Sequence, residues 1–411
     1  MYLRSVAALL LSSVVVVATT AVSTAESSHH VKSPEEEIAD GVIAWVREKG
    51  GYWNDKVEIR RVVVSDEVSY LGVFAAQDLQ ANEKVMNIPR DCYIDVLNEE
   101  DAPRLFTEDE SFRNYYTNVC MLSRKVQREL DLDEKSDYAP YIAYLKHQGH
   151  GQLPATWSQE GKELLRTVLS PQQRDVVDWI DMYYTKDSDE TIQCLPDNHS
   201  PEDQHILAMT VQRCYDTALI PLWDMVNHDN GRINTNSTSI YSDEGVTIFA
   251  SENIAAGAEI LATYDKCLDC MDISDYWGTP EILRDFGFVE RNAQRWVFEE
   301  HELWFELYEQ QNGSKALYWD DNEIYGDISD SSDPIVWGAP QTSGNKTDFL
   351  VGELDRLLKV DIPAAARVPS FERSTVVQFR EAAINALSLA LESVGVQQQQ
   401  QASDDTCTSV P

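Results

Sequence analysis

The densest group of chemically capable side chains lies between Ala218 and His228, in the segment ALIPLWDMVNH. The apolar run Val211–Ile220 predicts a helix that ends at the following proline, and Asp224, Asn227 and His228 come shortly after it. Carboxylate and imidazole groups can ligate a metal ion. No further set of His, Asp or Glu at ligand spacing accompanies them, so we expect no metal. On residue types alone, a polar loop with a hydrogen-bonded histidine is the simpler interpretation.

This segment resembles the P-L-x-D-M-x-N-H motif of the Rubisco lysine methyltransferase and actin-histidine methyltransferase group of SET-domain proteins. Other segments match that family in the same order along the chain. They are Leu71–Leu79 (LGVFAAQDL), Gly257–Ile260 (GAEI) followed by Tyr264, and Asp285–Glu290 (DFGFVE). Two more, Ala139–Ile142 and Leu153–Trp157, resemble the family's helical insertion.

The resemblance implies an S-adenosylmethionine-dependent protein N-methyltransferase that acts on lysine side chains of a non-histone protein. The implied cofactor-binding residues are Leu71, Gly72, Arg213, Asn227, His228 and Tyr264. Tyr264 is also the implied catalytic residue, and Phe286 and Phe288 are implied to wall the substrate channel. A glycine without Cβ at position 72 would let the cofactor approach the backbone. A lysine amine, with an ordinary pKa of about 10.4, must become neutral through burial before it can accept a methyl group.

Several residues depart from the family pattern. Asp265 follows Tyr264 where the family usually has glycine, an insertion covers Lys266–Thr279, and Phe286 stands where a tyrosine is common. Two alternatives therefore stay open beside a lysine methyltransferase: a protein-histidine methyltransferase, and a non-catalytic SET fold that binds proteins in the secretory pathway. For Tyr264, Phe286 and Phe288, simple packing in the core is the structural alternative.

The insertion carries Cys267 and Cys270, separated by two residues. A structural zinc site needs about four ligands, and only two are present. A redox C-x-x-C lacks its usual βαβ surroundings. A local disulfide between these two cysteines is the expectation that remains.

The chain of 411 residues is strongly acidic, with 33 basic and 70 acidic side chains and a formal charge of −37. Nucleic-acid binders need a basic face, so this composition excludes that class. The acidity has two interpretations: electrostatic attraction of a basic protein substrate, or solubility. We expect a protein substrate, possibly a basic one, and a monomeric chain.

The N-terminus has the pattern of a secretory signal peptide. Arg4 precedes the apolar run Val6–Val17, and small residues stand before a cleavage point after Ala25. The run is short for a membrane span, so none is expected after cleavage. Four N-glycosylation sequons follow, at Asn198, Asn236, Asn312 and Asn345. Together these features predict the endoplasmic reticulum lumen or secretion.

The order of elements predicts an α+β protein: a SET domain of short β-sheets with a knot-like core, a helical insertion and a helical C-terminal domain. A capping box at Ser33–Glu36 opens the first helix, and alternating apolar residues predict strands over 56–64, 71–76, 83–88, 246–250 and 259–263. The expected divisions are the signal peptide at 1–25, the N-terminal helix and first SET part at 26–99, the helical insertion at 100–210, the second SET part at 211–290, the helical substrate-binding-like domain at 291–395 and a disordered tail at 396–411.

Overall fold

The computed structural model describes residues 32–63, 69–96, 111–173, 175–184, 194–195, 199–215, 217–264, 278–291, 293–301, 303–309, 315–319, 344–363 and 367–407. The expected signal peptide, the Cys267–Cys270 pair and the sequons at Asn198 and Asn312 lie outside these residues. Among the described helices, none is long and apolar enough to cross a membrane.

The first helix, α1 (Pro34–Glu48), begins as the sequence predicts. The Glu36 amide donates to Ser33 Oγ at 3.3 Å, and the Ser33 amide donates to Glu36 Oε2 at 2.6 Å. The second oxygen of the Glu36 carboxylate accepts from the Arg61 amide at 2.9 Å. A cap that is local in sequence therefore also fixes α1 against strand β2 (Val57–Val63), where Arg61 lies.

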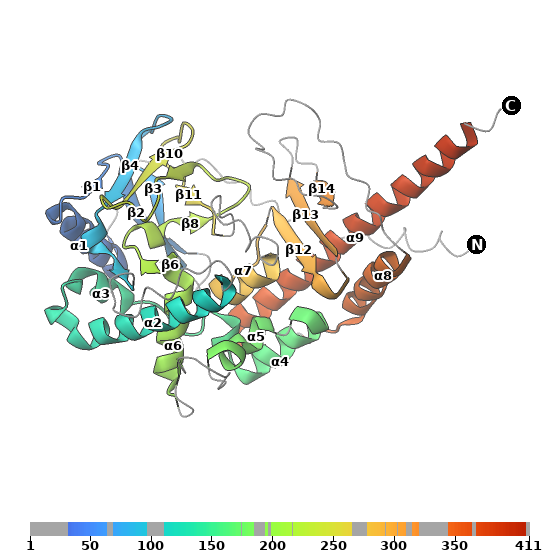
Figure 1. Cartoon of the computed structure of the whole chain (residues 1–411), viewed down its shortest axis with the longest axis horizontal. Helices are drawn as coiled ribbons and strands as arrows, with labels where there is room; N and C mark the ends of the chain where they lie inside the picture. Colours follow the sequence, from blue (N-terminus) through green and yellow to red (C-terminus); the bar gives the residue numbers. More distant parts are fainter. Residues whose placement is uncertain are drawn as a thin grey trace.

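Short strands form the centre of the N-terminal half (Figure 1). One sheet has the order β1 (Tyr52–Trp53), β4 (Lys84–Ile88), β10 (Val246–Ala250) and β9 (Thr235–Ser237). A hairpin pairs β2 (Val57–Val63) with β3 (Ser69–Ala75). A third sheet has the order β5 (Ile94–Asp95), β7 (Ala218–Leu219) and β6 (Cys214–Tyr215). The neighbouring strands in these sheets run antiparallel. The strands predicted over 56–64, 71–76, 83–88 and 246–250 are thus confirmed, with ends that differ by at most two residues.

A short parallel pair completes this half. Strand β8 (Asn227–His228) pairs with β11 (Leu261–Ala262), so two segments distant in sequence lie side by side. A single 3-10 turn, Trp223–Met225, leads into β8. Before it, Leu222 has a φ of 67° although it is fully buried, and such a conformation costs a non-glycine residue on the order of 1–3 kcal/mol. Packing of the Leu222 side chain holds the backbone in this bend, which directs β8 toward β11.

The helical insertion contains α2 (Ser111–Leu132), α3 (Ala139–Leu145), α4 (Gln159–Val168), α5 (Asp175–Trp179) and α6 (Pro201–Arg213). A disulfide joins Cys120 on α2 to Cys194, a pairing that the sequence left open. The helix expected over Val211–Ile220 is wrong beyond its first turn. After Arg213 the chain forms strands instead, because β7 (Ala218–Leu219) pairs with both β6 (Cys214–Tyr215) and β5.

The C-terminal part differs from the expected all-helical domain. After α7 (Thr279–Phe286) it forms an antiparallel sheet of β12 (Gln294–Phe298), β13 (Leu303–Glu309) and β14 (Lys315–Trp319), followed by α8 (Gly344–Lys359) and α9 (Ser370–Cys407). The expected disordered tail at 396–411 is also wrong up to Cys407, because α9 continues through a run of glutamines that are good helix formers. Figure 1 shows this long helix beside the C-terminal sheet.

Two large groups of buried apolar side chains support these parts. One gathers α1, α3 and the strands of the N-terminal half, and the other gathers α4, β12–β14, α8 and α9. Trp296 and Phe379, packed with ring centroids 5.5 Å apart, join β12 to α9 in the second group. The candidate site is lined by residues from both parts.

Candidate active site

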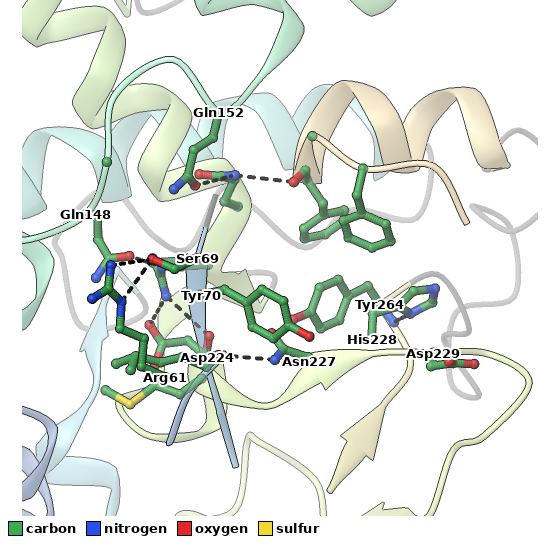
Figure 2. A pocket seen from close by; sticks show the side chains of 18 of the residues that line it. Arg61, Ser69, Tyr70, Gln148, Gln152, Asp224, Asn227, His228, Asp229 and Tyr264 are labelled. Carbon is green, nitrogen blue, oxygen red and sulfur yellow. Dashed lines mark hydrogen bonds and ion pairs between the residues drawn. The ribbon is translucent and has the colours of Figure 1, made fainter. Parts of the chain in front are cut away.

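A cavity of about 790 Å³ lies beside β3, β8 and the segment that follows α7 (Figure 2). Gln148 and Gln152, from the loop after α3, also line it. Phe371 and Gln378 add two side chains from α9. The volume falls within the usual range of small-molecule sites, about 300–1,000 Å³. The cavity is therefore large enough for a small-molecule ligand.

Asn227, on β8, contacts β3 and the segment just before β11 at the wall of this cavity. Its Nδ2 donates to the Leu71 carbonyl at 3.1 Å and to Glu259 Oε1 at 2.7 Å. Gly72 makes this contact possible, because a Cβ there would lie 2.6 Å from Glu259 Oε1 and 3.1 Å from Asn227 Nδ2. Burial raises the pKa of the Glu259 carboxyl, and the hydrogen bond from Asn227 opposes that rise. The absence of a Cβ at Gly72 thus leaves room for the Asn227–Glu259 hydrogen bond, in addition to any room that it leaves for a ligand.

Tyr264 is held at both its backbone and its ring. Its amide donates to Nδ1 of His228 at 3.0 Å, and its hydroxyl donates to the Val226 carbonyl at 2.8 Å. Since a backbone amide is always a donor, Nδ1 of His228 must accept, which places the imidazole proton on Nε2. That nitrogen lies 2.9 Å from Glu290 Oε1. Burial raises the pKa of the Tyr264 phenol, so this hydroxyl stays neutral.

Two phenylalanines form an aromatic wall beside Tyr264. The ring centroid of Phe286 is 4.6 Å from that of Tyr264, and the ring of Phe288 is 5.7 Å from that of His228. Both phenylalanines line the cavity and are only partly buried. Between them Gly287 has a φ of 80°, and a Cβ there would meet the Gln152 carbonyl oxygen at 2.4 Å. These rings therefore face the cavity rather than only filling a core.

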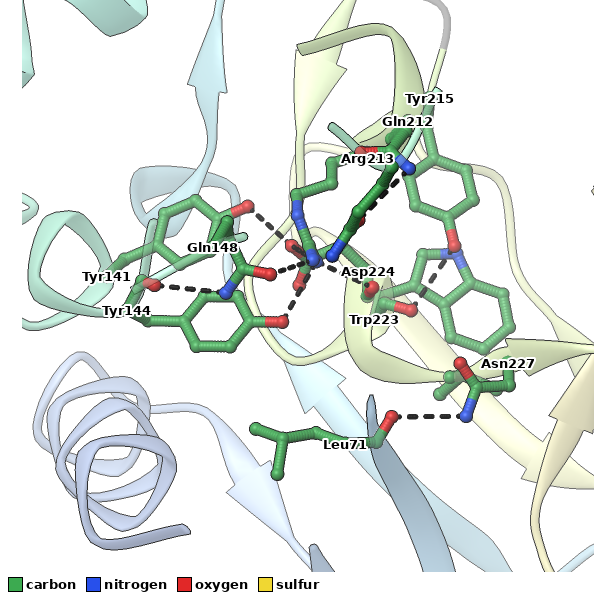
Figure 3. Close-up of polar contacts among 12 residues, drawn as sticks. Leu71, Tyr141, Tyr144, Gln148, Gln212, Arg213, Tyr215, Trp223, Asp224 and Asn227 are labelled. Atoms are coloured by element: carbon green, nitrogen blue, oxygen red, sulfur yellow. Dashed lines mark hydrogen bonds and ion pairs between the residues drawn. The ribbon is translucent and has the colours of Figure 1, made fainter. Parts of the chain in front are cut away.

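Arg213 lies at the centre of a buried polar network (Figure 3). Its Nη1 donates to Tyr144 Oη at 2.9 Å and to Asp224 Oδ2 at 3.1 Å, and its Nη2 donates to Gln148 Oε1. Tyr141 Oη donates to the same Asp224 oxygen at 2.9 Å. Burial raises the pKa of the Asp224 carboxyl, and the guanidinium beside it opposes the rise. Asp224 Oδ1 and Arg213 Nε are buried and have no hydrogen-bond partner among the described residues.

The structure brings the predicted site residues together. Those that line the cavity are Leu71, Arg213, Asn227, His228, Tyr264, Phe286 and Phe288, with Gly72 directly behind Asn227. Of the predicted sequons, Asn236 is exposed on β9, and Asn345 lies in α8.

Sequence reasoning missed two carboxylates. Glu259 and Glu290 both stand inside segments that the resemblance identified, yet their partners are 32 and 62 residues away in sequence. The Asp224 carboxylate was considered only as a metal ligand. Within the described part of the chain, no three His, Cys, Asp or Glu side chains lie close enough to hold a metal ion.

Comparison with known proteins gives a family match over part of the chain and similar folds among solved structures. The family described as "SET domain" matches residues 71–265. The fold resembles the crystal structure of the SET domain of LSMT bound to lysine and AdoHcy, with a TM-score of 0.51, 14% identity, and coverage of 90% of this chain and 93% of that one. The complex of the same domain with methyllysine and AdoHcy gives a TM-score of 0.51, 15% identity, and coverage of 92% and 94%. Among curated protein sequences, none matches this chain.

Proposed function

We propose that this SET-domain protein transfers methyl groups from S-adenosylmethionine to lysine side chains of a non-histone protein. The observation that carries the proposal is the convergence of Asn227, His228 and Tyr264 on one cavity with an aromatic wall. The similar LSMT structure holds lysine and AdoHcy, the product form of this cofactor, in one protein.

The lining of the cavity fits this cofactor. The amino-acid end of S-adenosylmethionine carries a carboxylate, and the Arg213 guanidinium, which is 14% exposed and lines the cavity, would attract it. Asn227 and His228, with the backbone at Leu71, would form the adjoining wall. When bound, the cofactor supplies a methyl group on a positively charged sulfur, which needs no further activation.

The residues of the chain then have to align the acceptor amine and keep it neutral. The proton of the Tyr264 hydroxyl is engaged by the Val226 carbonyl, so the oxygen lone pairs remain to accept a hydrogen bond from the amine. Phe286 and Phe288 exclude water, and burial among such rings lowers the pKa of a lysine amine. Holding the reacting atoms about 3–3.5 Å apart for in-line attack supplies most of the remaining catalysis.

Calorimetric titration of the mature chain, residues 26–411, with S-adenosylhomocysteine tests the proposal. We expect binding in the wild type and at least about tenfold weaker binding in Asn227→Ala, since about 1.4 kcal/mol corresponds to a factor of ten. Asn87→Ala is the matched control, because Asn87 also joins strands, through the Val246 carbonyl and Thr247 Oγ1, but lies outside the cavity. No binding by the folded wild type would leave the non-catalytic module as the better account.

Labelled S-adenosylmethionine identifies the acceptor. Incubation with a whole-protein extract, followed by amino-acid analysis of the labelled proteins, should yield methyllysine. Methylhistidine would instead show that the protein is a protein-histidine methyltransferase.

We further propose that the protein works in an oxidising compartment of the secretory pathway. The Cys120–Cys194 disulfide supports this, because such bonds persist mainly in oxidising environments. The exposed Asn236 adds an accessible sequon. Expression of the full chain in eukaryotic cells should give a product that begins after Ala25 and shifts on treatment with an N-glycosidase. An unshifted, uncleaved cytosolic product would contradict the proposal.

A further inference from the structure

We infer that Glu290 is a positioning residue for methyl transfer: its carboxylate orients His228 and, through it, the backbone of the catalytic Tyr264. The inference rests on the proposed function and assigns a role that the family resemblance did not suggest. Glu290 itself makes no bond to Tyr264, so it acts through its neighbours.

The carboxylate belongs to a closed ring of hydrogen bonds. Oε1 of Glu290 lies 2.9 Å from His228 Nε2 and accepts from Asn230 Nδ2 at 3.1 Å. The other nitrogen of His228 accepts from the Tyr264 amide. Asn230 Oδ1 accepts from Thr263 Oγ1 at 2.9 Å, and Thr263 is bonded covalently to Tyr264. The ring therefore reaches the backbone of Tyr264 from both sides.

The same carboxylate also clamps the aromatic wall. Its Oε2 accepts from Thr279 Oγ1 at 2.7 Å, so Glu290 is tied to the start of α7, whose last residue is Phe286. The wall-forming stretch from Thr279 to Glu290 is thus closed at its two ends. Through His228, this stretch is joined to the strand that carries Asn227. The Glu290 side chain therefore connects the aromatic wall, beside which the acceptor lysine would lie, to the strand that carries Asn227, beside which the cofactor would lie.

Because these hydrogen bonds are buried, their loss destabilises the folded protein. The side chains of His228 and Glu290 are each only 2% exposed. Removing one partner would leave the other with an unpaired buried group. The geometry also excludes His228 as a general base, since Nδ1 already accepts from the Tyr264 amide and Nε2 faces Glu290. The pair orients the site and does not itself move a proton.

Two substitutions separate positioning from bulk stability. Glu290→Gln keeps an oxygen that can accept from His228, and its amide can donate to Thr279 Oγ1. Glu290→Ala removes both contacts. Glu306→Ala is the control, because Glu306 pairs with Arg295 between β12 and β13 and lies outside the cavity lining. It should cost folding stability without disturbing the ring.

The rate readout compares kcat for methyl transfer with the Kd of S-adenosylhomocysteine. We expect Glu290→Ala to lower kcat about 10²-fold, as misplacement by about 1 Å can do, while Kd changes far less. Glu290→Gln should recover most of kcat, and Glu306→Ala should keep it. Wild-type kcat in Glu290→Ala, or no recovery in a folded Glu290→Gln, would overturn the inference.

A second readout needs no activity. In protein labelled with ¹⁵N-histidine, the His228 ring, assigned by its loss in His228→Asn, should show a protonated Nε2 and an unprotonated Nδ1. This pattern should persist in Glu290→Gln, whereas in Glu290→Ala the Nε2 resonance should shift, because the Nε2 proton loses its acceptor while the Tyr264 amide still holds Nδ1 as an acceptor. If the wild type fails to bind S-adenosylhomocysteine yet shows this response, the proposed methyl transfer fails while the orienting contact stands. Unchanged ¹⁵N resonances of the His228 imidazole in Glu290→Ala would refute the contact between Glu290 and His228 itself.

Discussion

At the scale of single residues, the Tyr264 hydroxyl is both hydrogen-bonded and kept neutral. Its hydroxyl is buried and donates to a backbone carbonyl, which satisfies its polar group. Burial also raises the pKa of the phenol, which prevents ionisation at any physiological pH. A neutral phenol with free lone pairs can hold an amine without competing for the methyl group. The rigid contacts to His228 and Phe286 complete its placement.

We predict that Tyr264→Phe lowers kcat for methyl transfer by about 10²-fold, as loss of one positioned hydrogen-bonding group commonly does. The Kd of S-adenosylhomocysteine should stay nearly unchanged. Tyr215→Phe is a matched control, since the Tyr215 hydroxyl donates to the Trp223 carbonyl at 3.2 Å but does not line the cavity. Both variants lose a comparable bond, so their unfolding free energies should fall alike. Equal losses of kcat would show that Tyr264 acts only in packing.

At the scale of elements, the structure shows which sequence patterns were sufficient to predict a helix or a strand. The helix α1 was predictable because its capping box is local, and β10 because its buried residues alternate. The strands β12 and β13 were misassigned as helix, although their alternating buried apolar residues, such as Phe305 and Leu307, carried a period-two signal. The tail of α9 was misassigned because its polar composition was given more weight than its helix propensity.

The site was predictable only as far as its motifs extend. Asn227, His228 and Tyr264 were found through resemblance, and the structure places them at one cavity. The Glu290 contact to His228 joins residues 62 positions apart, and no local spacing encodes such a pair. The strained φ of Leu222, which shapes the approach to β8, is likewise a product of tertiary packing.

The disulfide between Cys120 and Cys194 should stabilise the helical insertion. It closes a loop with a sequence separation of 74, for which loop-closure entropy gives a stabilisation of about 4 kcal/mol. We expect a reductant to lower the urea midpoint of the wild type, and Cys120→Ser/Cys194→Ser to show the lower midpoint without it. The double variant should respond little to the reductant, because the Cys267–Cys270 bond expected from the sequence closes only a short loop. An unchanged midpoint in that variant would mean that the bond adds nothing to stability.

Helix α7 should make stability depend on pH through Glu281. Burial raises the pKa of this carboxyl to about 8, Arg284 opposes the rise, and Asp175 adds to it. The unfolded chain loses this proton near the ordinary glutamate pKa of about 4.3, whereas the folded chain keeps it to about pH 8, so stability falls as pH rises through that window. Glu281→Gln should flatten the melting temperature between pH 5 and about 8. An equally steep decline in the variant would contradict this assignment.

At the scale of the whole molecule, the charge of −37 admits two accounts, solubility and attraction of a basic substrate. Removal of residues 1–25 takes away one positive charge, Arg4, and leaves −38. Charge of this size produces a field that reaches beyond the surface, and salt reduces that reach from about 30 Å at 0.01 M to about 8 Å at 0.15 M. Ionic strength therefore separates the two accounts.

We predict that methylation of a lysine peptide flanked by basic residues slows as salt rises. Its kcat/KM should fall several-fold between about 0.01 and 0.15 M ionic strength, because steering acts on encounter, while kcat stays constant. A peptide of the same length with acidic flanking residues should start slower and become faster over the same range, since screening relieves repulsion. This second peptide also controls for general salt effects on the enzyme. If the two peptides respond alike, the acidity serves solubility and the substrate is not selected by its charge.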